Sequence, residues 1–168
     1  MAFPAPRHTD FDATPWVEPL LADARNTVIS QSWRNPQPGT TKDSLFTKTL
    51  NTPDTFRAFV VIDTPAETLT IVALGSGVNA HENVAHGGLV MTLMDEGLSA
   101  CVREPNFTAY LNTTFKNLVP TPSVVVCRSR VVRRAGKKIW IEGTLEDGTG
   151  RVLAEAQALY IDPFYGKL

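Results

Sequence analysis

Residues 86–102 read His-Gly-Gly-Leu-Val-Met-Thr-Leu-Met-Asp-Glu-Gly-Leu-Ser-Ala-Cys-Val, and this stretch decides the fold. It predicts one helix whose apolar side chains are spread around nearly its whole circumference. They are Leu89, Val90, Leu93, Met94, Leu98, Cys101 and Val102. A helix that is apolar nearly all round is normally enclosed on every side. We therefore expect a single long helix at the centre of the molecule.

Two polar features interrupt this apolar helix. Asp95 shares a face with Thr92 and Ser99, which favours a carboxylate at the wall of a cavity. Gly87 and Gly88 stand at the start of the helix and leave its first free backbone N–H groups unshielded. Such a helix start can accept an oxyanion. The stretch thus predicts a carboxylate and an anion-binding helix start.

The chain on either side of this stretch, from residue 56 to residue 161, predicts strands rather than further helices. The β-branched-rich runs that we read as strands are residues 56–62, 69–74, 106–116, 123–133, 138–145 and 151–161. Short turns such as Asp147-Gly148 permit antiparallel hairpins but not parallel crossovers. One buried helix and about six antiparallel strands make an α+β fold in which a curved sheet wraps around the helix.

The N-terminal part has a different character. Residues 1–14 predict an arm, a helix begins at Pro19 and continues through Val28, and residues 32–43 predict a loop. We expect residues 1–54 to form an arm, an extra helix and a linker packed on the main domain. The main domain then spans residues 55–168.

Composition excludes several classes of protein. A chain of 168 residues suits one domain, and its formal net charge of −1 gives no overall attraction to nucleic acid or membranes. Cys101 and Cys127 are too few for a disulfide framework. The first residues lack the apolar core of a signal peptide, and no run reaches transmembrane length. We expect a cytoplasmic protein.

A resemblance to a known family gives these features a function. The run His86-Gly87-Gly88, followed after six residues by Asp95, resembles the signature of hotdog-fold acyl-CoA thioesterases. Residues 108–112, Thr-Ala-Tyr-Leu-Asn, resemble a strand of the phenylacetyl-CoA thioesterase-like and mammalian-type branch. The resemblance runs from about residue 69 to 161. It implies a hotdog fold, a homodimer or dimer of dimers, an acyl-CoA substrate, and neither metal nor cofactor.

The resemblance also implies roles for individual residues. Asp95 is the general base or nucleophile, because the matching Asp of the family acts on the thioester in one of these ways. His86 orients the thioester, and Thr108 of the partner subunit helps to hold the attacking water. For the oxyanion donor we choose the Gly87 backbone N–H, since loss of one such donor typically costs about 2.7–4 kcal/mol in barrier.

A basic hairpin supplies candidate contacts to coenzyme A. Six of the sixteen basic side chains lie within residues 128–138, where Arg or Lys could make charge-assisted contacts to the phosphates of coenzyme A. A short charge run is also typical of a solvated turn. The substrate-binding residues that we predict are Asn83, Gly88, Lys116, Arg133, Arg134, Lys137 and Lys138.

Three functions remain open on the sequence alone. The first is hydrolysis of an acyl-CoA to the free acid and coenzyme A. The second uses the same site on an acyl-carrier-protein thioester in a biosynthetic pathway. The third is a non-catalytic module that binds an acyl ligand. We expect no zinc site, because His81 and His86 would lie about 140° apart on a helix.

Overall fold

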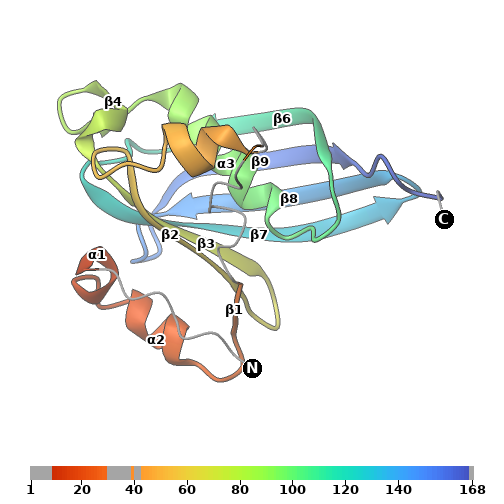
Figure 1. Ribbon diagram of the computed structural model, residues 1–168, viewed down its shortest axis with the longest axis horizontal. Coiled ribbons are helices and arrows are strands. Elements are labelled where there is room, and N and C mark those ends of the chain that lie inside the picture. Colours follow the sequence, from red (N-terminus) through yellow and green to blue (C-terminus); the bar gives the residue numbers. More distant parts are fainter. Residues whose placement is uncertain (1–8, 30–38, 40–42, 167–168) are drawn as a thin grey trace.

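An antiparallel sheet forms the body of the molecule, and the computed structural model describes residues 9–29, 39 and 43–166 of the chain. The sheet has seven strands in the order β1-β2-β3-β7-β8-β9-β6 (Figure 1). Their bounds are β1 (Thr27–Ile29), β2 (Phe56–Asp63), β3 (Thr68–Leu74), β6 (Phe107–Phe115), β7 (Ser123–Ala135), β8 (Lys138–Glu146) and β9 (Val152–Ile161). The predicted α+β class and the antiparallel pairing are confirmed, with β1 as a strand that the sequence did not predict.

The predicted central helix is α3 (Gly87–Ser99), and it packs on one face of the sheet. Leu93, Met94 and Leu98 are almost fully buried. At Gly97 the helix approaches β7 so closely that an added Cβ would lie 2.5 Å from Cys127 Sγ. Met91, however, is 36% exposed. The expectation that the helix is enclosed on every side is therefore wrong for one chain, because the sheet covers only one side of it.

The opposite face of the sheet carries a second apolar cluster. Side chains alternate along β2, so that Phe59 and Val61 belong to the cluster under α3 while Val60 and Ile62 belong to the other cluster. Two short helices, α1 (Thr9–Asp12) and α2 (Val17–Ala22), cover this second cluster, to which β3 and β7 also contribute side chains. Figure 1 shows α3 and these two helices on opposite sides of the sheet.

The N-terminal predictions need correction. The predicted helix from Pro19 to Val28 ends at Ala22, because Asp23 takes an extended conformation. The β-branched residues that follow form β1 and pair with β2. Residues 9–12 of the predicted arm are helical, and their Phe11 is 2% exposed. Most of the predicted loop 32–43 lies outside the described residues, and the boundary at residue 54 stays a prediction.

Smaller elements complete the fold around α3. The π-helical turn η2 (Leu45–Thr49) places Phe46 against Phe56 and Phe59, with ring centroids 5.8 and 6.5 Å apart. The 3-10 turn η3 (Ser76–Val78) and the short pair β4 (Asn79–His81) and β5 (Val84–Ala85) lead into the start of α3. No helix in the described ranges is long and apolar enough to cross a membrane.

Candidate active site

The start of α3 leaves one backbone donor free. His86 is the N-cap, and its Nδ1 accepts a hydrogen bond of 2.9 Å from the Gly88 N–H. A Cβ on Gly88 would lie 3.1 Å from that nitrogen, so the glycine makes room for the cap. The Gly87 N–H has no hydrogen-bond partner in the described part of the chain. This N–H, at the positive end of the helix dipole, can therefore polarise a carbonyl oxygen.

An open cleft of about 810 Å³ lies beside this helix start. It brings together three predicted site residues, Asn83, Gly87 and Lys116. Asn83 takes a positive φ of 58° in the turn between β4 and β5, a conformation that Asn tolerates well. The apolar wall of the cleft includes Val84, Val90, Phe115, Leu118 and Val119, while Arg151 adds a second cation to its rim. The cleft thus has room for an apolar group beside the free N–H. We call Gly87 and this cleft the amide half-site.

Asp95 stands at the centre of a second cluster. Its Oδ1 accepts a hydrogen bond of 2.8 Å from the Thr108 hydroxyl and lies 2.9 Å from the Tyr160 hydroxyl. The Tyr160 hydroxyl is also 2.8 Å from the backbone carbonyl oxygen of Asp95. Asp95 is half-buried, whereas Tyr160 is fully buried. We call these three residues the carboxylate half-site.

This geometry corrects the placement of Thr108. The resemblance implied that Thr108 comes from the partner subunit, but its hydroxyl contacts Asp95 of the same chain. The reason lies in the pairing of β6 with β9, which sets Thr108 opposite Tyr160. Since the Tyr160 hydroxyl reaches Asp95, its neighbour on β6 reaches the same point of α3.

The two half-sites lie too far apart to act together within one chain. Gly87 and Asp95 are eight residues apart on α3, which corresponds to about 12 Å along the helix axis. A donor and a base that act on one carbonyl must each come within roughly 3–3.5 Å of the reacting atoms. One chain therefore provides two separate half-sites, one with a free N–H and one with a carboxylate.

The basic hairpin lies beyond the carboxylate half-site. Lys138 is opposite Ile161 in the sheet, one position past Tyr160. Arg133 stacks over Trp140 at 4.6 Å, and Arg134 lies 3.6 Å from Glu104. The structure does not bring the hairpin into the cleft with Asn83 and Lys116, so a role in coenzyme A binding stays a prediction.

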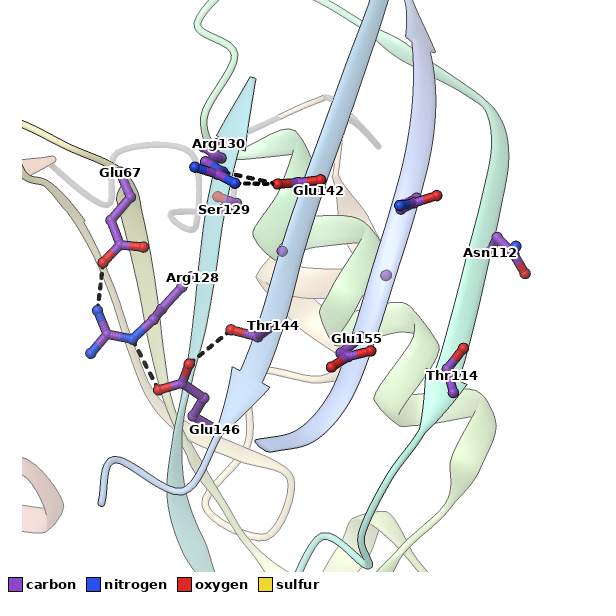
Figure 2. A pocket seen from close by; sticks show the side chains of 13 residues that line it. Glu67, Asn112, Thr114, Arg128, Ser129, Arg130, Glu142, Thr144, Glu146 and Glu155 are labelled. Atoms are coloured by element: carbon purple, nitrogen blue, oxygen red, sulfur yellow. Dashed lines mark hydrogen bonds and ion pairs between the residues drawn. The ribbon is translucent and has the colours of Figure 1, made fainter. Parts of the chain in front are cut away.

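A second depression, of about 580 Å³, is polar and lies on the other face of the sheet. Figure 2 shows its side chains along β7, β8, β9 and β6, with α3 behind the sheet. Arg128 is bound between Glu67 and Glu146 at 2.5 and 3.0 Å. This face holds neither Asp95 nor Gly87, and its cations are engaged in ion pairs, so it is not the candidate active site.

The described residues contain neither a metal-binding cluster nor a reactive thiol. Among them, no group of His, Cys, Asp and Glu is placed to hold a metal ion. Burial raises the pKa of the Cys101 thiol to about 11 and raises that of Cys127 still further. Both thiols therefore stay protonated near neutral pH and are poor nucleophiles.

Sequence reasoning missed two residues of the half-sites, Tyr160 and Arg151. Along β9 the positions that face α3 carry Ala154, Ala156 and Ala158 before Tyr160. A period-two pattern of alanines that ends in one large polar side chain is a signal that marks Tyr160. No comparable signal marks Arg151, which follows the turn between β8 and β9.

The comparisons with known proteins agree with this geometry. The family described as Thioesterase superfamily matches residues 82–154, which include α3, Gly87, Asp95 and Thr108 but not Tyr160. A thioesterase-like protein of Streptococcus pneumoniae, crystallised with coenzyme A, superposes with a TM-score of 0.58 at 12% identity, covering 66% of this chain and 92% of that one. The fold is therefore a hotdog fold, as the resemblance implied.

Sequence relatives place the chain more narrowly. The acyl-coenzyme A thioesterase THEM4 of Bos taurus is 35% identical over 77 residues, which are 45% of this chain and 32% of that protein. An uncharacterized mitochondrial protein of Candida albicans is 31% identical over 105 residues, or 56% of this chain and 47% of its own length. The chain thus spans less than half the length of these relatives. Its residues 82–154 match the thioesterase superfamily model, and its fold is the hotdog fold.

Proposed function

We propose that this protein is a homodimeric hydrolase that cleaves acyl-CoA thioesters to the free acid and coenzyme A. The observation that carries the proposal is the pair of complementary half-sites on α3, one with a free N–H and the other with a carboxylate bound to hydroxyls. The similarity to an acyl-coenzyme A thioesterase and the family match support this reaction class.

A second copy of the chain joins the two half-sites. Strand β6 is the edge strand of the sheet, so one row of its backbone groups has no partner strand. Large apolar side chains are also exposed along it, with Phe107 65%, Tyr110 47% and Phe115 51% exposed. An exposed apolar edge strand favours pairing with another strand, and a twofold axis makes such a contact self-complementary.

Pairing of β6 with its own copy places the correct groups together. An antiparallel pairing centred on Leu111, the middle residue of β6, sets Phe107 of one chain opposite Phe115 of the other, so Thr108 lies next to this pair. The Phe115 ring lies 3.7 Å from the position that a Cβ on Gly87 would take. Each amide half-site then meets the carboxylate half-site of the other copy. The dimer has two such sites.

The joined half-sites can hydrolyse a thioester by general base catalysis. Thr108 helps to hold a water molecule near Asp95, whose carboxylate takes a proton as the water oxygen attacks the carbonyl carbon. The carbonyl π electrons move to oxygen, where the Gly87 N–H stabilises the oxyanion. Collapse of this intermediate breaks the C–S bond, and the proton on Asp95 goes to the departing thiolate of coenzyme A. The apolar wall of the cleft suits the acyl chain.

The test combines a substrate panel with two matched substitutions. Release of free thiol is measured on aromatic, short and long acyl-CoAs and on acyl-carrier-protein thioesters. Asp95→Asn removes the ionised carboxylate at nearly constant volume, so we expect turnover to be abolished in a folded protein. Near-native turnover of folded Asp95→Asn would contradict the mechanism. An acyl ligand that binds without thiol release would favour a binding module.

Gly87→Pro removes only the amide donor. Gly87 is the first residue of α3, where proline is well tolerated, and His86 has φ −64° and ψ 133°, which suits a residue before proline. We expect kcat to fall by about 10²–10³-fold. The control is Gly87→Ala, which keeps the N–H and brings its Cβ only within 3.7 Å of Phe115. Equal activity of the two variants would exclude the Gly87 N–H as the oxyanion donor.

A further inference from the structure

Tyr160 is the one residue of the carboxylate half-site that is fully buried. It extends from β9 toward α3, and its ring belongs to the apolar cluster under that helix. A buried tyrosine normally finds a hydrogen-bond partner for its hydroxyl. Here both oxygen atoms within reach of the hydroxyl belong to Asp95, at 2.8 Å on the backbone and 2.9 Å on the carboxylate.

This arrangement fixes the carboxylate from two directions. The Tyr160 hydroxyl has a single proton, and whichever oxygen receives it, the phenol stays anchored on Asp95. The Thr108 hydroxyl, on the neighbouring strand β6, donates a hydrogen bond of 2.8 Å to Oδ1. Two hydroxyl groups therefore surround Oδ1, while Oδ2 has no hydrogen-bond partner among the described residues. Oδ2 is the oxygen left for the proton of the attacking water.

The tyrosine also keeps its proton. Burial, together with the charge of Asp95 and the hydrogen bond to it, raises the pKa of Tyr160 above its ordinary value. The phenol thus remains a neutral donor throughout the pH range in which a thioester is stable enough to assay.

We infer that Tyr160 is a positioning residue for the base: its hydroxyl orients Asp95 so that Oδ2 faces the substrate. This inference rests on the proposed function and adds to it a residue that does not touch the substrate. It assigns distinct work to the two hydroxyl groups, since Thr108 is exposed and can contact the water, whereas Tyr160 is closed off from it.

Tyr160→Phe tests this assignment because it deletes the hydroxyl and keeps the buried ring. We expect kcat to fall by roughly 10–100-fold with KM changed less than about twofold. The control is Tyr165→Phe, which deletes an exposed hydroxyl and should match the wild type. An unchanged kcat, or a loss of activity that comes from a raised KM, would overturn the inference.

A second measurement does not depend on turnover. The NMR chemical shift of the Asp95 carboxyl carbon is measured at neutral pH, with Asp95→Asn to assign its signal. We expect the chemical shift to change in Tyr160→Phe and not in Tyr165→Phe, because Tyr160 contacts the carboxylate; an unchanged shift in Tyr160→Phe would overturn the inference. A wild type that cleaves no thioester would refute the proposed function alone, while the NMR comparison still decides on Tyr160.

Discussion

Mixing two inactive variants tests whether each active site is built from two chains. Asp95→Asn damages only the carboxylate half-site, and Gly87→Pro damages only the amide half-site. In a mixed dimer, the chain with Gly87 intact meets the chain with Asp95 intact at one site, while the other site carries both lesions. Because these positions are eight residues apart, about 12 Å along the helix, one chain cannot supply both groups to one site.

The expected recovery follows from counting dimers. When equal amounts of the two variants exchange at random, about half of the dimers are mixed, and each mixed dimer has one intact site of two. The mixture should therefore regain about a quarter of the wild-type activity. Thiol release is measured before and after exchange, with exchange itself followed by mass spectrometry of the native dimers.

A second mixture serves as the control for this result. Asp95 and Thr108 belong to the same half-site of the same chain, so Asp95→Asn mixed with Thr108→Ala should regain nothing. If confirmed exchange restored activity in this mixture and not in the first, Thr108 would act across the dimer and the assignment of half-sites would be refuted. Failure of both mixtures would mean that each site is built from one chain.

Two further predictions concern packing and coenzyme A. Gly97→Ala should lower the free energy of unfolding by about 1–3 kcal/mol in urea titrations, because its Cβ would lie 2.5 Å from the buried Cys127 Sγ; unchanged stability would contradict the close packing of α3 on β7. Joint neutralisation of Arg133, Arg134, Lys137 and Lys138 should raise KM for acyl-CoA more than it lowers kcat, because phosphate contacts bind ground state and transition state alike. An unchanged KM would reduce the hairpin to a solvated turn.

The sequence predicted the sheet well because its strands carry their own signals. Runs of β-branched residues between Gly- and Pro-containing turns placed six strands close to their observed bounds. The N-terminal segment lacked such clear runs of β-branched residues between turns. Leu20, Leu21 and Ala24 have helical spacing, but Asp23 ends the helix and Thr27–Ile29 join the sheet edge at β2. The local spacing of apolar residues could not predict that residues 27–29 form an edge strand, because their pairing with β2 is a tertiary contact.

The sequence alone predicts some distances within the site but not which strand residues reach it. The count from Gly87 to Asp95 alone gives a separation of about 12 Å on a helix, so the distance between the two half-sites was contained in the sequence. The sequence did not show that Thr108 contacts the Asp95 of its own chain, since this contact depends on how residues 100–106 bring the chain back to pair with β9. Tyr160 was concealed for the same reason: only the register of β9 against β6 and the packing of α3 show that its hydroxyl ends on Asp95. The positions of residues in a helix fix the distances between them along the helix axis, whereas strand pairing decides which residues distant in the sequence contact the helix.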